Sequence, residues 1–162
     1  MSTHGTPFED VFQRAIFKFK DFAFLDFSPD IKSAVFYNHL LSAITDFSRA
    51  SIIPLTYSLI DKSDDNTEPE LEPESSKYAF NNLLGIEEIE ILALGIAFHW
   101  LSGQVLNSEL LRNVMHNRDY KSYSPANLLK EMQNLRTFIK TEFVGRINIY
   151  SFRNSNLQNM RP

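Results

Sequence analysis

The sequence predicts an all-α protein, a small helical bundle of about four to five helices with a long acidic loop and an extended C-terminal tail. Three segments open with Thr-Pro or Ser-Pro, a pair typical of a helix start, at Thr6-Pro7, Ser28-Pro29 and Ser124-Pro125. Each is followed by apolar residues at steps of three and four, the spacing of one helix face. Only 5 of the 162 residues are glycine and 43% are hydrophobic, so one helical core is expected.

The first two helices are predicted at 7 to about 20 and at 29 to about 49. The residues Thr6-Pro7-Phe8-Glu9 match a capping box, in which the Thr6 hydroxyl and the Glu9 carboxylate would bond backbone N–H groups that lack helical partners. Both helices have an apolar face that fits a core. The apolar positions are Phe8, Val11, Phe12, Ala15, Ile16 and Phe19 in the first helix, and Ile31, Val35, Leu41, Ile44 and Phe47 in the second.

Two segments without a helical pattern follow. Residues 51–59 are rich in β-branched side chains but contain Pro54, which predicts a connector or an edge strand. Residues 61–76 contain seven carboxylates, two prolines and one leucine, too little apolar surface to offset the entropy lost on ordering. This acidic Pro/Glu-rich segment is interpreted as a solvated loop, or else as a fringe that repels nucleic acid or meets a basic neighbour.

The third helix is predicted at 86–102 and is apolar on nearly every side after an acidic start at Glu87, Glu88 and Glu90. Such a helix lies at the centre of a bundle or is covered by a neighbouring subunit. Gly103 is expected to end it, and Asn107 to open a short helix that reaches residue 115. The last helix is predicted from 125 to about 146, with Leu128, Met132, Leu135 and Ile139 on its apolar face.

The chain divides in this interpretation into a helical domain at 1–148 and an extended tail at 149–162, which has alternating apolar residues and low helix propensity. Charge is also divided. Up to Leu111 there are 7 Lys and Arg against 17 Asp and Glu, a net of −10, and from Arg112 on there are 9 against 3, a net of +6. This asymmetry favours head-to-tail contact between copies or a basic face on an acidic partner, unless the acidic loop alone accounts for it.

The sequence contains no pattern of catalytic, metal-binding or cofactor-binding residues, so we expect no enzyme activity, no metal and no cofactor. Cysteine is absent, which removes thiol nucleophiles and Cys-based zinc sites. The four histidines are scattered, and His99 beside Trp100 is interpreted as a core or interface residue. We expect no signal peptide, and no membrane span because the apolar run at 91–101 is shorter than the roughly 18 residues that a span needs.

The segment EEIEILALGIAFHWLSGQVLNSELLRNVMHNRDYKSYSPANLLKEMQNLR, Glu87 to Arg136, resembles a family of head–tail connector (neck) proteins of tailed bacteriophages. The similar features are the acidic helix start, the apolar helix ending in Trp-Leu, the Asn-Ser-Glu-Leu-Leu-Arg helix, the Asp-Tyr turn and the Ser-Pro-Ala-Asn start. The N-terminal FEDVFQRAIFKFKDFAFLDFSPDI and the closing INIYSF are also similar. The chain departs from the family pattern at Gly85-Ile86 and in its longer Pro/Glu-rich insert.

The resemblance implies a structural virion protein, an adaptor that sits beneath the portal protein as a ring, commonly of twelve copies. The ring would extend the DNA channel and join the portal to the next neck or tail-completion protein. DNA would pass through without sequence-specific binding, and no membrane would be involved. The resemblance places the protein in the virion neck after assembly in the host cytoplasm. A stopper or tail-completion protein, one ring further from the portal, is an alternative.

Two sets of residues are candidates for contacts in such an assembly. The candidates for contact with the portal or within the ring are Tyr120, Tyr123, Ile149, Tyr150, Phe152, Arg153 and Leu157. The candidates for the core or a subunit interface are Phe12, Ile96, Trp100, Leu128 and Leu135. Two other classes stay open, a small helical binding or assembly module and a nucleic-acid-binding protein that uses its basic C-terminal part. A steep salt dependence of DNA affinity would favour the latter.

Overall fold

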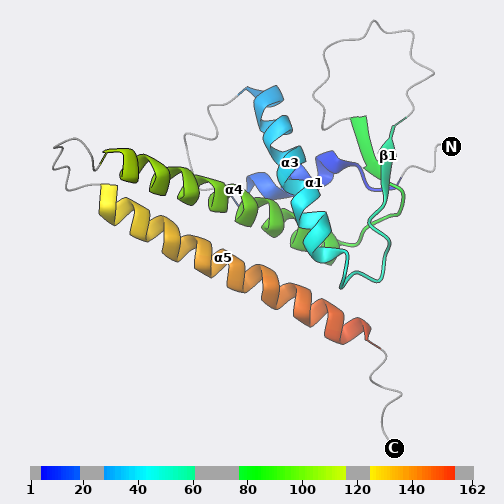
Figure 1. Cartoon of the computed structure of the whole chain (residues 1–162). Helices are drawn as coiled ribbons and strands as arrows, with labels where there is room; N and C mark the ends of the chain where they lie inside the picture. Colours follow the sequence, from blue (N-terminus) through cyan, green and yellow to red (C-terminus); the bar gives the residue numbers. More distant parts are fainter. Residues whose placement is uncertain (1–4, 19–27, 61–76, 116–124, 156–162) are drawn as a thin grey trace, which may run out of the picture.

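The computed structural model describes residues 5–18, 28–60, 77–115 and 125–155 and confirms the all-α class (Figure 1). Within these ranges four helices pack together, and two short strands form a hairpin beside them. The acidic loop expected at 61–76 lies outside the described residues. In chain order the elements are α1 (Phe8–Ile16), α3 (Pro29–Phe47), β1 (Tyr57–Leu59), β2 (Tyr78–Phe80), α4 (Ile86–Met115) and α5 (Pro125–Asn154).

The central helix of the bundle is α4. It contacts α1, α3 and α5, and α5 runs antiparallel to it (Figure 1). Its residues Ile91, Leu92, Ala93, Leu94 and Ile96 are at most 4% exposed, although consecutive residues point to different sides of a helix. The apolar character of α4 on every side is therefore explained by the helices of the same chain that enclose it.

The composition of α4 also passes the criteria for a membrane span. Residues Ile86–Asn107 are long and apolar enough to cross a membrane, and their most apolar part has a mean hydropathy of 1.5. This stretch is longer than the apolar run at 91–101 on which the sequence-based expectation was founded. Of the residues in that most apolar part, 56% are buried inside the protein, and packing among α1, α3 and α5 accounts for their hydrophobicity.

Gly95 lies where α3 and α5 both approach α4. A Cβ built on Gly95 would lie 2.5 Å from the Cβ of Ala43 on α3 and 3.1 Å from the ring of Phe143 on α5. Both separations are shorter than ordinary contacts between carbon atoms. Ala43 and Phe143 are themselves buried. Glycine at this position therefore allows three helices to pack closely at one point of the core.

The predicted capping box at Thr6 is wrong. The residue before α1 is Pro7, and no side chain caps the helix there. The Thr6 hydroxyl instead accepts a hydrogen bond from the Leu84 N–H at 2.8 Å, and the Thr6 N–H donates to the Asn82 carbonyl oxygen at 3.1 Å. Thr6 is buried, so its polar groups are used to hold the segment before α4. A tertiary hydrogen bond replaces the local cap.

The predicted cap of the second helix is confirmed. The Ser28 hydroxyl oxygen accepts a hydrogen bond from the Ile31 N–H at 3.4 Å, with Pro29 in the first helical turn. This helix, α3, ends at Phe47, near the expected boundary, whereas α1 ends earlier than expected, at Ile16. Local chemistry therefore sets the start of α3 but does not set the end of α1.

The hairpin packs its aromatic side chains around Phe8 of α1. The two strands are antiparallel, with Tyr57 opposite Phe80, so the segment at 51–59, predicted to be a connector or an edge strand, ends in a strand. The Phe8 ring centre lies 4.8 Å from that of Phe80, 5.2 Å from that of Tyr57 and 5.9 Å from that of Tyr78. These separations are typical of aromatic pairs, and the cluster holds α1 against the hairpin.

The expected break in the third helix at Gly103 and Asn107 is wrong, because α4 is continuous to Met115. Gly103 does not adopt the positive φ that ends many helices. On either side of it Leu101 and Val105 are each 4% exposed. Burial of both residues keeps this turn packed on the core, so a glycine is accommodated inside the helix.

The expected extended tail from residue 149 is also wrong, because α5 is helical as far as Asn154. The boundary drawn between 1–148 and 149–162 therefore falls inside a helix. Phe143, Ile147 and Tyr150 are spaced by four and three residues, and all three pack in or against the core. This helical stripe prevails over the alternation that suggested an extended chain. Residues 156–162 lie outside the described part of the chain.

Gly95→Ala is expected to lower the free energy of unfolding by about 1–3 kcal/mol, because the added methyl group overpacks the crossing with Ala43. Gly103→Ala on the same helix is the matched control. A Cβ at Gly103 meets nothing within 4 Å, so alanine should stabilise the protein by about 0.5–1 kcal/mol. Urea unfolding followed by circular dichroism measures both changes. Equal stabilisation by the two substitutions would show that the close crossing does not exist.

Candidate interaction surface

Helix α5 has apolar residues on two different faces. Its inner face packs on the core through Phe143 and Tyr150, each 2% exposed. Its outer side carries five large apolar side chains that are between 43% and 70% exposed: Leu135, Phe138, Val144, Ile149 and Phe152. Isolated exposed apolar residues are ordinary on protein surfaces, but several on one helix indicate an interaction surface.

Four of these residues and two others form a continuous stripe, which we call the α5 seam: Leu135, Phe138, Glu142, Gly145, Ile149 and Phe152. Successive members are 3, 4, 3, 4 and 3 residues apart, so they lie on one side of the helix. Val144 falls outside this spacing. With a rise of 1.5 Å per residue, the seam extends over about 26 Å.

The centre of the seam is hollow. Gly145 has no side chain, and a Cβ built there would meet nothing within 4 Å. An open depression of about 410 Å³ lies here, lined by Glu87 of α4 and by Thr141, Glu142, Gly145, Arg146, Ile149 and Arg153 of α5. The depression interrupts a row of large apolar side chains. This is the kind of groove into which a side chain of a second helix packs.

Two contacts hold the C-terminal end of α5 on the first turn of α4. The buried Tyr150 hydroxyl donates a hydrogen bond to Glu88 Oε1 at 2.9 Å. Arg153 Nη1 donates to both carboxylate oxygens of Glu87, at 3.0 and 3.2 Å, on the surface. Burial raises the pKa of the Tyr150 hydroxyl, and its bond to Glu88 raises this pKa further, so the phenol stays protonated and able to donate.

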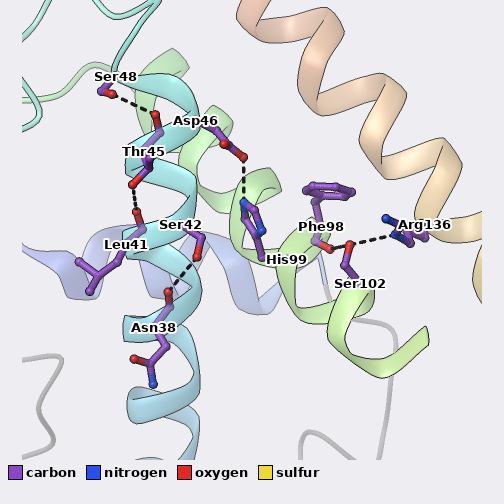
Figure 2. Close-up of polar contacts among 10 residues, drawn as sticks. All are labelled: Asn38, Leu41, Ser42, Thr45, Asp46, Ser48, Phe98, His99, Ser102 and Arg136. Carbon is purple, nitrogen blue, oxygen red and sulfur yellow. Dashed lines mark hydrogen bonds and ion pairs between the residues drawn. The ribbon is translucent and has the colours of Figure 1, made fainter. Parts of the chain in front are cut away.

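Arg136 holds the preceding part of α5 on α4. Its Nε donates to Ser102 Oγ at 3.0 Å, and Ser102 Oγ donates to the Phe98 carbonyl oxygen at 2.8 Å (Figure 2). The guanidinium carbon of Arg136 lies 5.9 Å from the centre of the Phe98 ring, a cation–π separation. Arg136, one of the basic residues of the C-terminal part, is therefore engaged within the protein.

Charged contacts also join α1 and α3 to α4. Glu90 pairs with Arg14 and with Lys18, whose Nζ lies 2.7 Å from Glu90 Oε2. Burial opposes ionisation of the Glu90 carboxyl, but its contacts with Lys18 and Arg14 outweigh burial and hold its pKa below the usual value. On α3, Asp46 Oδ2 lies 3.0 Å from His99 Nε2 (Figure 2). His99 therefore has a structural partner on a neighbouring helix of the same chain.

The structure places the predicted contact residues in different environments. Tyr150 lies in the core, because the helical conformation turns its ring toward Phe47 on α3, with ring centres 5.1 Å apart. Three others are exposed near the C-terminal end of α5: Ile149, Phe152 and Arg153. Three lie outside the described residues: Tyr120, Tyr123 and Leu157.

The candidates for the core or a subunit interface also separate. Phe12 and Ile96 are buried, and Trp100 is half-buried and packs against the core. Leu135 is 46% exposed and belongs to the seam. The side chain of Leu128 lies outside the described part of the chain. Phe12 and Ile96 are therefore core residues, whereas Leu135 is accessible to a partner.

The predicted contact residues did not include Phe138, Glu142 or Gly145, three members of the seam. The signal was a spacing of seven residues, since Phe138, Gly145 and Phe152 recur at that interval. Such a stripe becomes evident only when the buried face of the helix is known, because α5 carries apolar residues on both faces.

Within residues 5–18, 28–60, 77–115 and 125–155, no group of three or more His, Asp or Glu side chains lies close enough together to hold a metal ion. Comparisons with protein-family models, with curated proteins and with solved structures found no match to this chain. The function is therefore inferred from the chain's own residues.

Tyr150→Phe is expected to lower the free energy of unfolding by about 1–3 kcal/mol, because the buried Glu88 carboxylate loses a donor while the ring packing is kept. Arg153→Met is the control at the neighbouring surface ion pair, where the loss should be about 0.2–1 kcal/mol. Urea unfolding at neutral pH measures both losses. A Tyr150→Phe protein as stable as the original would show that Glu88 does not depend on this hydrogen bond.

His39 on α3 is expected to make stability depend on pH. Burial lowers its pKa from 6.5, and the nearby His99 lowers it further. The unfolded chain therefore binds a proton at higher pH than the folded chain, so stability is full above about pH 6.5 and falls as the pH drops through the folded pKa. His39→Gln should flatten this dependence in urea unfolding experiments. An unchanged pH profile in the variant would contradict the prediction.

Proposed function

We propose that this protein is a structural component of the neck of a tailed bacteriophage, one of a ring of copies that joins the portal protein to the next connector or tail component. The starting point of this proposal is the resemblance of residues 87–136, and of two flanking segments, to head–tail connector proteins. The observation that carries the proposal is the outer side of α5, where Phe138, Ile149 and Phe152 are each more than half exposed. An assembly gives such residues a surface to pack on, whereas an isolated chain leaves them in water.

In this function the chain acts by position rather than by chemistry. The contacts of Tyr150 and Arg136 with α4 hold α5 in one orientation, and a ring of identical subunits needs the same contact angle at every interface. The net charge of the chain is −4, which gives DNA little general attraction because nonspecific DNA affinity comes from cationic contacts with phosphates. DNA then passes through the channel without being held.

A small helical assembly module is the second candidate, since the same exposed face of α5 favours it. The two functions differ in stoichiometry. A ring component assembles in many copies on the portal, whereas a module binds its partner in one or two copies. A stopper or tail-completion protein would bind the adaptor ring rather than the portal, so its contact would be found one step further along the neck.

The full chain mixed with the portal protein of the same genome is expected to form a complex that carries a ring of copies. Native mass spectrometry counts the copies, and particle imaging shows which end docks. Phe152→Glu should weaken the complex roughly ten-fold or more, because it places a charge in an apolar contact. Leu59→Glu on β1 is the control, since Leu59 is similarly exposed, 63% against 70%. A chain that joins neither the portal nor the next connector would sink the neck function.

A further inference from the structure

We propose that the α5 seam recognises itself. In the free protein, α5 of one copy packs antiparallel against α5 of a second copy, with the two-fold axis between Glu142 and Gly145. This pairing adds to the proposed function a specific contact between two copies. It rests on that function in one respect, since both treat the outer side of α5 as an assembly surface. The seam residues, their spacing and their charges each support the pairing.

The spacing of the seam is that of a two-helix coiled coil. Residues 3, 4, 3, 4 and 3 apart alternate between the two heptad positions that meet a partner helix. Leu135, Phe138, Ile149 and Phe152 occupy four of the six positions and are between 46% and 70% exposed. The core of the chain uses a separate stripe that contains Phe143 and Tyr150. The seam is therefore a second face of α5 that lies outside the core formed by the described residues.

The two members of the seam that are not large and apolar determine the orientation. A parallel pair would place Glu142 against Glu142 of the second copy, with two like charges together, and would leave a gap between two glycines. An antiparallel pair centred between residues 142 and 145 places Glu142 against Gly145 of the second copy. The same register brings Leu135 to Phe152 and Phe138 to Ile149. Large side chains then meet large side chains, and the carboxylates are separated.

Charge complementarity favours a second copy as the occupant of this surface. Arg146 follows Gly145, and its Nη2 lies 3.2 Å from Glu142 Oε1 of the same chain. In the antiparallel register Arg146 also lies beside Glu142 of the second copy. Two arginines and two glutamates then lie around the two-fold axis, with positive and negative side chains in alternation. The side chains of Arg146 and Glu142 are 43% and 36% exposed, so a partner can reach them.

Gly145 provides the space that the second helix requires. Glycine is unfavourable in a helix interior, and among the described residues nothing beyond its chain neighbours and its own helix backbone lies within 4 Å of a Cβ at this position. Packing within one chain therefore does not explain why the position lacks a side chain. A second helix does, because the Glu142 side chain of the second copy enters the depression of about 410 Å³ beside Gly145 and meets Arg146 there.

The pairing has a consequence for assembly. A contact between identical surfaces closes on two copies, whereas a ring with a single rotation axis is built from contacts between different surfaces. The α5 pair is therefore a form of the free protein, and ring formation replaces it. Ile149 and Phe152 belong both to the seam and to the proposed portal contact. Pairing covers them until the portal is present and so opposes assembly elsewhere.

The mass of the free full-length chain tests the pairing directly. Size exclusion with light scattering is expected to give twice the chain mass of 18.8 kDa. Phe138→Glu should shift the mass toward that of one chain, because it introduces a carboxylate on each side of the axis. Leu59→Glu, at 63% exposure against 64% for Phe138, should leave the dimer intact. A wild-type protein with the mass of one chain, or a dimer that survives Phe138→Glu, would overturn the proposal.

Cysteine cross-linking tests the orientation, since the chain has no cysteine of its own. Leu135→Cys and Phe152→Cys are made in separate proteins and oxidised alone and as a mixture. The antiparallel pair predicts a disulfide-linked dimer only in the mixture, because two copies of the same residue are about 26 Å apart along the helices, far beyond disulfide reach. Cross-linking of each variant with itself would indicate a parallel pair. That result, or no cross-link at all, would overturn the proposal.

The outcomes separate this inference from the proposed function. If the chain forms a cross-linked antiparallel dimer but never joins the portal or the next connector, the seam contact is supported and the neck function is ruled out. If the chain is monomeric when free but forms a ring on the portal, the neck function is supported and the seam contact is ruled out.

Discussion

Close packing on both sides of α4 depends on the absence of a side chain at Gly95. A Cβ there would lie 2.5 Å from the Cβ of Ala43 on α3 and 3.1 Å from the ring of Phe143 on α5, so neither neighbour could keep its position. The approach of α5 to α4 in turn brings the Tyr150 hydroxyl within 2.9 Å of Glu88. A single small residue therefore determines how α5 lies on the core. That placement determines which residues of α5 are buried and which face the solvent.

Two apolar stripes on α5 have different physical origins. Burial of Phe143 and Tyr150 is explained by the fold, because removing apolar surface from water stabilises the bundle by about 25 cal/mol for each Å². The exposure of Phe138 and Phe152, at 64% and 70%, has no such explanation in one chain. Because the stripes lie on different faces of a helix that is held on α4 by Arg136 and by its C-terminal end, a partner can cover the outer stripe without disturbing the inner one.

The features that the sequence predicted correctly are those that depend on neighbouring residues. Ser28 before Pro29 marks a helix start, and the apolar run of α4 marks a helix that is covered on every side, either at the centre of a bundle or by a neighbouring subunit. The wrong predictions concern residues whose conformation depends on distant contacts. Thr6 bonds the N–H of Leu84 rather than its own helix, and Gly103 is held in α4 by the packing of the turns around it. No local pattern contains that information.

The candidate surface was predictable in part for the same reason. Ile149 and Phe152 are conspicuous apolar residues in a polar segment, and both are exposed in the structure, as a candidate contact residue must be. Their conformation was misjudged, because residues 149–154 alternate like a strand while Tyr150 continues the helical stripe of the core. Gly145 was not predictable, because a glycine in a helix becomes informative only when its surroundings are known to be empty.

Residues of the core and residues of the candidate contact surface alternate along the last turns of α5. Ile149 and Phe152 face outward, and Tyr150 between them is buried against α3 and α4. Removing the segment after Arg146 would therefore remove a core aromatic residue and the donor to Glu88 along with the contact residues. A loss of assembly after such a truncation would not distinguish a lost interface from a weakened fold. Only substitutions confined to the outer residues can separate the two, because the inner stripe and its hydrogen bond then stay in place.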